Sequence, residues 1–272
     1  MISKKEIKTY MPFALNVIQR NLSYKANAVI FVVGEALMLA VSYFLWKAIY
    51  ASSPEPIING FNFNEMVIYV LMSFLTGLLV NTDISYDISS EVKDGSIAMN
   101  LIRPINYERR MMFQGFGNAI YNFSIIFIWG AIGVTILLLK SNMTLSPLAI
   151  LGYFISVICG LVINFYYSYI FGLLAFKLTN MWGLSQVMNA IIQLLSGLLI
   201  PITFFPIWAQ KLINLTPFSS MIYTPTMIYL GKITGVEMWS SIFIQLIWVF
   251  ILLFIARMMW KKLIKHLVIL GG

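Results

Sequence analysis

The chain has 272 residues, of which 60% are hydrophobic and 10% are charged, against roughly 25% charged residues in an ordinary soluble domain. A soluble domain of this length must cover its core with polar side chains, and this chain has too few of them. The composition therefore excludes a water-soluble enzyme and favours an integral membrane protein. One cysteine and one histidine are also too few to predict a disulfide framework or a metal site.

Residues 1–26 place apolar side chains three or four positions apart, which predicts an amphipathic helix lying in the membrane interface. The same segment is also compatible with a simple basic anchor or with a helix that binds a partner. Six apolar stretches follow, each long enough to cross a hydrocarbon core of about 30 Å. These predicted spans are residues 27–50, 65–82, 113–139, 148–175, 184–205 and 240–260. The sequence thus predicts an all-α integral membrane protein with one transmembrane domain over residues 1–272.

The 18 basic residues are distributed unevenly over the predicted loops. Fourteen of them share the side of the two termini, and only Lys47, Lys140, Lys211 and Lys232 lie on the other side. Because basic residues are retained on the inner side of a membrane, both termini are predicted to be cytoplasmic, in a bacterial-type cytoplasmic membrane. The net charge of +8 then needs no nucleic acid to explain it.

The predicted cytoplasmic loop 83–110 is the densest cluster of charged residues in the chain. Asp94-Gly95 predicts the end of one short helix, because glycine tolerates the left-handed conformation found at helix ends. A second short helix is expected to stop before Arg103-Pro104. Two short helices joined at a glycine favour a surface that docks a partner over an ordinary solvated loop.

The segment 206–239 is interrupted by prolines and glycines but is too apolar for a normal external loop. Pro201 and Pro206 are expected to break the preceding helix, and irregular backbone at membrane depth is tolerated only where protein or a water-filled cavity satisfies it. The segment is therefore predicted to form a re-entrant hairpin or a pair of short external helices.

Polar side chains line one face of the second, third and fifth predicted spans. Such residues are costly in a membrane and tend to face the interior of a helix bundle, where they either line a substrate pathway or join helices together. On the fifth span they occupy a sector about 80° wide. The predicted pathway residues are Tyr69, Ser73, Thr76, Gln186, Asn189, Gln193 and Ser196. Glu35, the only acid well inside a span, is expected to be structural, with a proton relay as the alternative.

Three segments, taken in order, resemble the ABC-2-type permeases, the membrane subunits of ATP-binding cassette exporters. The segment SGLLIPITFFPIWAQKLINLTPFS is similar to the family's fifth-span signature, and EVKDGSIAMNLIRPINY resembles its cytoplasmic coupling region. The segment TPFSSMIYTPTMIYLGK is similar to the branch called ABC-2 family transporter protein. The resemblance covers nearly the whole chain.

The resemblance implies a dimer of permeases, identical or homologous, that engages two ATP-binding subunits. ATP and Mg²⁺ would be bound by those subunits, since this chain has no GxxxxGK[ST] phosphate-binding motif. By position, the residues implied to contact the ATPase are Asp87, Glu91, Lys93, Asp94, Gly95, Arg103, Pro104, Lys177 and Asn180.

The function expected from this resemblance is export of a lipophilic drug, antibiotic, peptide or lipid, with no catalysis by this chain itself. An ion-driven secondary transporter is the nearest alternative, but it would be expected to show inverted repeats and more charge within the membrane. An intramembrane lipid-modifying enzyme would need clustered acids or His/Asp pairs, which this sequence does not show.

Overall fold

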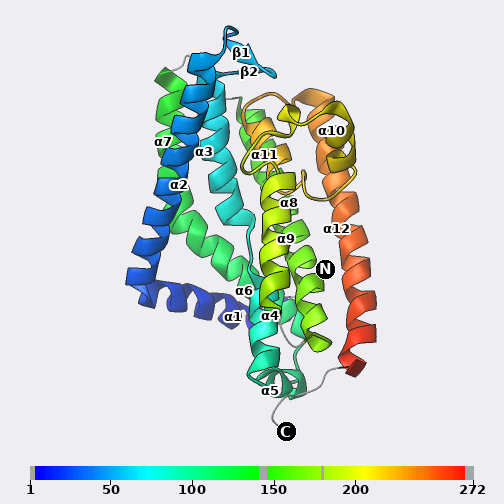
Figure 1. Cartoon of the computed structure of the whole chain (residues 1–272). Coiled ribbons are helices and arrows are strands. Elements are labelled where there is room, and N and C mark those ends of the chain that lie inside the picture. The colour runs from blue at the N-terminus through cyan, green and yellow to red at the C-terminus, as the bar shows by residue number, and fades with distance from the viewer. Residues whose placement is uncertain (1–3, 141–145, 179–180, 267–272) are drawn as a thin grey trace.

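The computed structural model describes residues 4–140, 146–178 and 181–266, and nearly all of its regular structure is helical (Figure 1). The long helices run side by side between two ends of the molecule. We call the end that carries α1, α4 and α5 the α5 end, and the end that carries the two strands the hairpin end. The α-helices are α1 (Lys4–Ser23), α2 (Lys25–Ser52), α3 (Phe63–Val80), α4 (Ile84–Lys93), α5 (Ile97–Ile102), α6 (Tyr107–Asn122), α7 (Ile128–Lys140), α8 (Pro147–Leu173), α9 (Trp182–Leu195), α10 (Ile207–Asn214), α11 (Tyr223–Tyr229) and α12 (Gly235–Leu263).

Four short helical turns and two short strands complete the description of these residues. A π-helical turn, η1 (Phe123–Phe127), joins α6 to α7, and 3-10 turns follow α8, α9 and α12 as η2 (Leu174–Phe176), η3 (Ile202–Phe204) and η4 (Ile264–His266). The strands β1 (Ile57–Ile58) and β2 (Phe61–Asn62) pair antiparallel. This hairpin was not predicted, although its turn residues Asn59 and Gly60 both have the positive φ that an Asn-Gly turn adopts.

Five segments of the described chain are long and apolar enough to cross a membrane. They confirm the predicted all-α membrane fold, and they correspond to the first, second, third, fourth and sixth predicted spans. The segments are Val29–Ser52, Phe63–Lys93, Tyr107–Leu138, Pro147–Phe176 and Gly235–Leu263.

The helix in the fifth predicted span is shorter than expected. α9 ends at Leu195 instead of continuing to residue 205, because the backbone turns at Gly197, where φ is +78°. α9 and the irregular segment after it return the chain toward the hairpin end (Figure 1). The prolines Pro201 and Pro206 therefore lie beyond the helix end and do not cause it.

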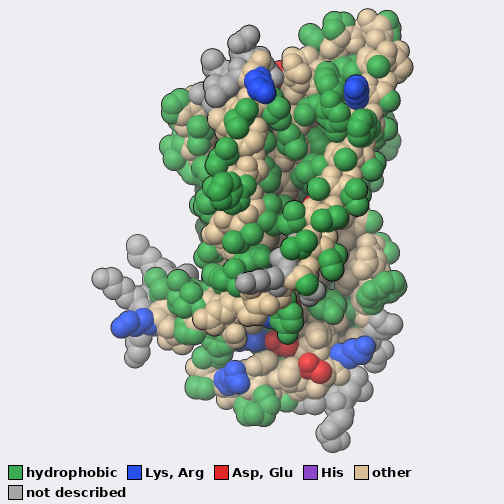
Figure 2. All heavy atoms as spheres, turned by 90° about the vertical axis from the view of Figure 1, so that its left-hand side faces the viewer, with side chains coloured by type: hydrophobic (Ala, Val, Ile, Leu, Met, Phe, Trp, Pro, Cys, Tyr) green, Lys and Arg blue, Asp and Glu red, His purple; other side chains and the backbone are tan. Residues whose placement is uncertain are grey.

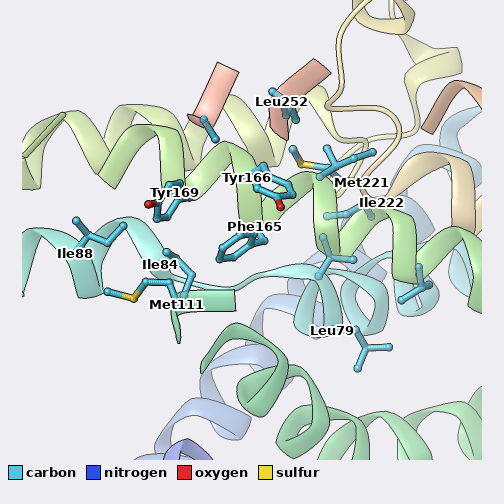
Figure 3. Close-up of a cluster of buried hydrophobic side chains, with 14 of the residues drawn as sticks. Leu79, Ile84, Ile88, Met111, Phe165, Tyr166, Tyr169, Met221, Ile222 and Leu252 are labelled. Atoms are coloured by element: carbon cyan, nitrogen blue, oxygen red, sulfur yellow. The ribbon is translucent and has the colours of Figure 1, made fainter. Parts of the chain in front are cut away.

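The core is built around α8, which packs against α3, α4, α11 and α12. Its buried aromatic residues Phe165 and Tyr169 face Ile84 and Ile88 of α4 (Figure 3). The same apolar cluster includes Met111 of α6 and residues of α12. α4 is thus joined to the membrane helices through a continuous apolar contact.

The outer surface of the bundle matches a lipid environment. Hydrophobic side chains cover the middle of the face shown in Figure 2, and charged side chains gather at its two ends. α2 exposes large apolar residues along its whole length, among them Val29, Leu37, Val41 and Phe44. Because a water-soluble surface does not expose apolar side chains on this scale, these helices face lipid or another membrane protein.

The predicted amphipathic helix is present as α1, which runs across the long helices at the α5 end (Figure 1). Tyr10 and Ala14 are buried against Phe113 of α6. The closest approach is at Gly117, where an added Cβ would lie 2.5 Å from the carbonyl oxygen of Ala14. Ile7, Met11, Leu15 and Leu22 remain exposed on the other side of the helix, as expected for a helix in the interface.

The segment 206–239 contains the two short helices α10 and α11 at the hairpin end. α10 exposes Ile207, Trp208 and Leu212, whereas α11 is buried from Thr224 to Tyr229. A pair of short helices was one of the two predicted alternatives for this segment.

Candidate functional site

The first candidate site is the protrusion formed by α4 and α5 at the α5 end, which we call the docking knob (residues 84–102). As predicted, α4 ends at Lys93 and the chain turns at Gly95, where φ is +75°, before α5 begins. Asp94 accepts a 2.9 Å hydrogen bond from the backbone N–H of Ser96, which fixes the turn. The hydrogen bonds from Ser96 hold the pKa of Asp94 below its ordinary value of 3.8, so this exposed carboxylate stays charged at neutral pH.

The docking knob is held rigidly on α8. Ile84 and Ile88 are fully buried, and the backbone N–H of Ser85 donates a 2.9 Å hydrogen bond to Ser168 Oγ. Gly172 allows the two helices to touch, since a Cβ at this position would lie 2.7 Å from Ile88 Cδ1. The docking knob is therefore packed directly against a membrane helix.

Glu91 forms a second link between the docking knob and the bundle. Its two oxygens lie 2.6 and 2.7 Å from Nη2 of Arg110, and Tyr107 donates a 2.9 Å hydrogen bond to Oε2. Tyr107 in turn stacks on Trp260 of α12 at 5.2 Å between ring centroids. Glu91 was predicted to contact the ATPase, but in the structure its carboxylate is used to hold α4 to α6 and, through Tyr107, to α12.

The other predicted contact residues divide by exposure. Lys93, Asp94, Arg103 and Pro104 are exposed, while Asp87 and Gly95 are half-buried. Lys177 is exposed directly after η2, which packs against α4, so it lies on the same side as the docking knob. Asn180 lies outside the described residues.

Three exposed apolar side chains of the docking knob were not predicted as part of the site. Tyr86, Met99 and Ile102 are 67%, 60% and 74% exposed, and all three lie outside the spans predicted from the sequence. The helical periodicity of residues 84–102 could have indicated them, because their positions are not on the buried face of Ile84, Ile88 and Ile97. Large apolar residues grouped at a protruding end are typical of a protein-binding surface.

The second candidate site is a cavity of about 560 Å³, a volume in the range of small-molecule sites. It is lined mainly by residues of α2, α3, α6 and α9, and toward the α5 end it is bordered by Arg20, Asn21, Tyr24, Asn81 and Asp83. Deeper in, the wall has both apolar and polar residues. The polar residues of this deeper part are Glu35, Asn118, Tyr121, Asn122, Asn164, Asn189 and Gln193.

Two of the predicted pathway residues of the fifth span, Asn189 and Gln193, line this cavity. Gln186 is exposed on α9 but does not border the cavity. Ser196 is fully buried, and its Oγ has no hydrogen-bond partner within the described chain. The four polar residues predicted on the fifth span therefore do not share one environment. Two of them line the cavity, one lies on the outer surface and one is in the core.

The predicted pathway residues of α3 do not line the cavity. Tyr69 donates a 2.5 Å hydrogen bond to the carbonyl oxygen of Gly197, and Ser73 donates one of 3.2 Å to that of Leu198. Thr76 lies 2.9 Å from the hydroxyl of Tyr153 on α8. All three side chains are fully buried. Their placement favours the alternative that these residues join helices, here by satisfying the broken backbone after α9.

Several amides of the cavity wall already have partners. Asn21 donates a 3.0 Å hydrogen bond to Asn118, and Asn122 donates one of 2.7 Å to the carbonyl oxygen of Leu78. Asn164 accepts one of 3.1 Å from Thr82. Within the described residues, Glu35, Tyr121, Asn189 and Gln193 have no such partner and remain available to a bound molecule. No group of three or more His, Cys, Asp or Glu side chains in the described chain is arranged to hold a metal ion.

A bundle of apolar helices with a rigid docking knob at one end and a polar cavity beside it defines a multi-pass membrane transport protein. Residues 36–271 match the family described as ABC-2 family transporter protein, and the chain belongs to this family. It is thus a membrane permease of an ATP-binding cassette transporter, and the family implies an ATPase partner. Comparisons with curated proteins and with solved structures found no match.

Proposed function

We propose that this permease exports a lipophilic drug, antibiotic, peptide or lipid from the cytoplasm, using ATP and Mg²⁺ bound by a separate ATPase. The ATPase would dock on the docking knob, and the substrate would enter the polar cavity. The observation that carries the proposal is the rigid attachment of α4 to α8 and α6, because a coupling element must move together with the membrane helices that it controls.

The distribution of charge supports a cytoplasmic α5 end. Exposed basic residues gather there, among them Lys93, Arg103, Lys177 and Lys261, as basic residues do on the inner side of membranes. The cavity extends to the same end, where Arg20 and Asp83 border it, which suits a substrate that is collected from the cytoplasm or the inner leaflet. Both features fit export.

The outer face of α9 supports assembly with a second permease, identical or homologous. None of the residues of α9 is fully buried within the chain, and Gln186 is exposed without bordering the cavity. Amide side chains are costly against lipid and tend to face protein or a water-filled space. A second permease that packs against this face would cover Gln186 and close the open side of the pathway.

The docking surface is tested by reversing two neighbouring charges of the docking knob. Lys93→Glu combined with Asp94→Lys keeps the net charge but inverts the pattern that an ATPase would meet. We expect the recovery of the ATPase subunit, identified by its GxxxxGK[ST] motif in mass spectrometry, to fall at least tenfold when the tagged chain is purified from its host.

The matched control for this test is Lys211→Glu, which changes an exposed charge on α10 at the hairpin end. The control should co-purify the ATPase as the unaltered chain does. Equal recovery with the doubly altered docking knob, in a protein that is still inserted in the membrane, would contradict this docking surface.

A further inference from the structure

The inner part of the cavity contains one ionisable group with no charged partner. Glu35, on α2, lies six positions after the start of the candidate span Val29–Ser52, which is roughly 9 Å along a helix. The described residues provide no ion pair or hydrogen bond to its carboxyl group. An unpaired carboxylate is costly at this depth. A molecule that places a positive charge beside Glu35 should therefore bind more favourably than a neutral one.

The charged residues at the α5 end of the cavity do not fill this role. Of the charged residues that border the cavity, Arg20 is the only base, and it interacts electrostatically with Asp87 of α4. Asp83, the second acid, is at the α5 end of the cavity, on the junction between α3 and α4. That end of the cavity therefore has an acid and a base, whereas deeper in Glu35 is the only acidic or basic side chain of the wall.

The surroundings of Glu35 indicate the rest of the ligand. Tyr121, Asn189 and Gln193 offer donors and acceptors without partners, which suit hydroxyl or amide groups. Apolar side chains from four elements complete the wall, and they suit an aliphatic or aromatic portion of the ligand. They include Phe31, Val32, Met38, Phe74, Ile125, Ile126, Leu198 and Leu199.

We propose that the cavity selects a cationic amphiphile, with a protonated amine paired to Glu35, its hydroxyl or amide groups on Tyr121, Asn189 and Gln193, and its apolar portion against the surrounding side chains. The inference rests on the proposed function and narrows its substrate to a chemical class. Glu35 precedes the residues that match the family, so family membership does not by itself supply this role.

The test measures binding to the purified full chain in nanodiscs of neutral phosphatidylcholine. One probe is dodecylamine with a nitrobenzoxadiazole fluorophore at the far end of its chain, and the other is the same molecule with its amine acetylated. Anisotropy is corrected with empty nanodiscs for partition into lipid. We expect the amine to bind at least tenfold more tightly than the acetylated probe.

Glu35→Gln should reduce that difference to threefold or less, because it removes the charge and keeps the shape. Glu237→Gln, at an exposed acid in the first turn of α12, should leave the difference unchanged. The comparison of the two probes on the unaltered chain remains valid whether or not a variant folds.

Equal binding of the two probes, or an unchanged preference in Glu35→Gln, would overturn the proposal. The measurement requires no ATPase, so its outcome is independent of the docking experiment. Selective binding with failed docking would count against the proposed function alone, and docking without selectivity would count against the assigned substrate class alone.

Discussion

Arg110 holds the only position in the described chain where a nearly buried guanidinium meets a carboxylate from another helix. Its side chain is 5% exposed and that of Glu91 is 16% exposed. A single nitrogen, Nη2, contacts both carboxylate oxygens, and Nε is buried without a partner. Both hydrogen bonds of the pair therefore come from one nitrogen, and the other donors of the planar guanidinium do not contact Glu91.

Arg110→Met should lower the free energy of unfolding by about 3–5 kcal/mol, because it leaves Glu91 with an uncompensated charge in a largely buried site. Arg110→Lys should cost less, since one ammonium group can serve both oxygens. The measurement is the thermal midpoint in detergent, followed by tryptophan fluorescence. Arg103→Met, at an exposed position, should change stability by no more than about 0.5 kcal/mol. Equal midpoints for Arg110→Met and Arg103→Met would show that the pair is not important for stability.

At the scale of helices, the contact between α4 and α8 depends on a glycine. Gly172 lies under Ile88 and Ser85, and a Cβ there would approach Ile88 Cδ1 to 2.7 Å and Ser85 Cα to 3.1 Å. Backbone atoms of Ser85 cannot move without moving α4 as a whole. A single methyl group at this position should therefore displace the docking knob from the membrane helix.

Gly172→Ala should destabilise the chain by about 1–3 kcal/mol, the usual cost of overpacking a buried contact. It should also reduce the stimulation of the partner ATPase by substrate, because the docking knob no longer moves rigidly with α8. Gly183→Ala on α9 is the matched control, since no atom lies within 4 Å of an added Cβ there. The control should be as stable as the unaltered chain or slightly more so, because alanine favours helix more than glycine does. Equal thermal midpoints for the two variants would contradict the tight contact.

The sequence predicts those parts of the fold that depend on local pattern. The long apolar stretches and the turn at Asp94-Gly95 are such features, and both are present in the structure. The position at which α9 ends is not determined by local sequence alone, because the backbone at Gly197 is held by the hydroxyl of Tyr69, 128 positions away. The pairing of Glu91 is also tertiary. A charged residue in a predicted loop is expected to be solvated, and only the fold brings Arg110 to it.

The cavity shows the same division between local and tertiary information. Asn189 and Gln193 were predicted from helical spacing, which local pattern determines. The burial of Tyr69, Ser73 and Thr76 depends on which helix covers that face of α3, and no periodicity within one helix contains this information. Glu35 was recognised as unusual, but its place in a cavity follows only from the packing of α2 beside α3, α6 and α9.

At the scale of the whole molecule, two exposed apolar faces are expected to differ in what covers them. α12 exposes Phe243, Phe250 and Phe254, with no amide among these residues, so this face is suited to lipid. α9 exposes Val187 and Leu194, and Gln186 on the same helix is exposed without bordering the cavity. The mixed face of α9 is the one that a second permease would cover.

Cysteine crosslinking can distinguish the two faces. The native Cys159 is buried in α8 and can be replaced by alanine to give a background without thiols. In that background, Val187→Cys should form a disulfide or a short bis-maleimide crosslink between two permeases in native membranes, seen as a band of twice the mass or of the mass of a heterodimer. Phe250→Cys, of similar exposure on α12, should remain monomeric because lipid surrounds it. Crosslinking at Phe250→Cys but not at Val187→Cys would place the permease interface on α12 and remove α9 from the centre of the transporter.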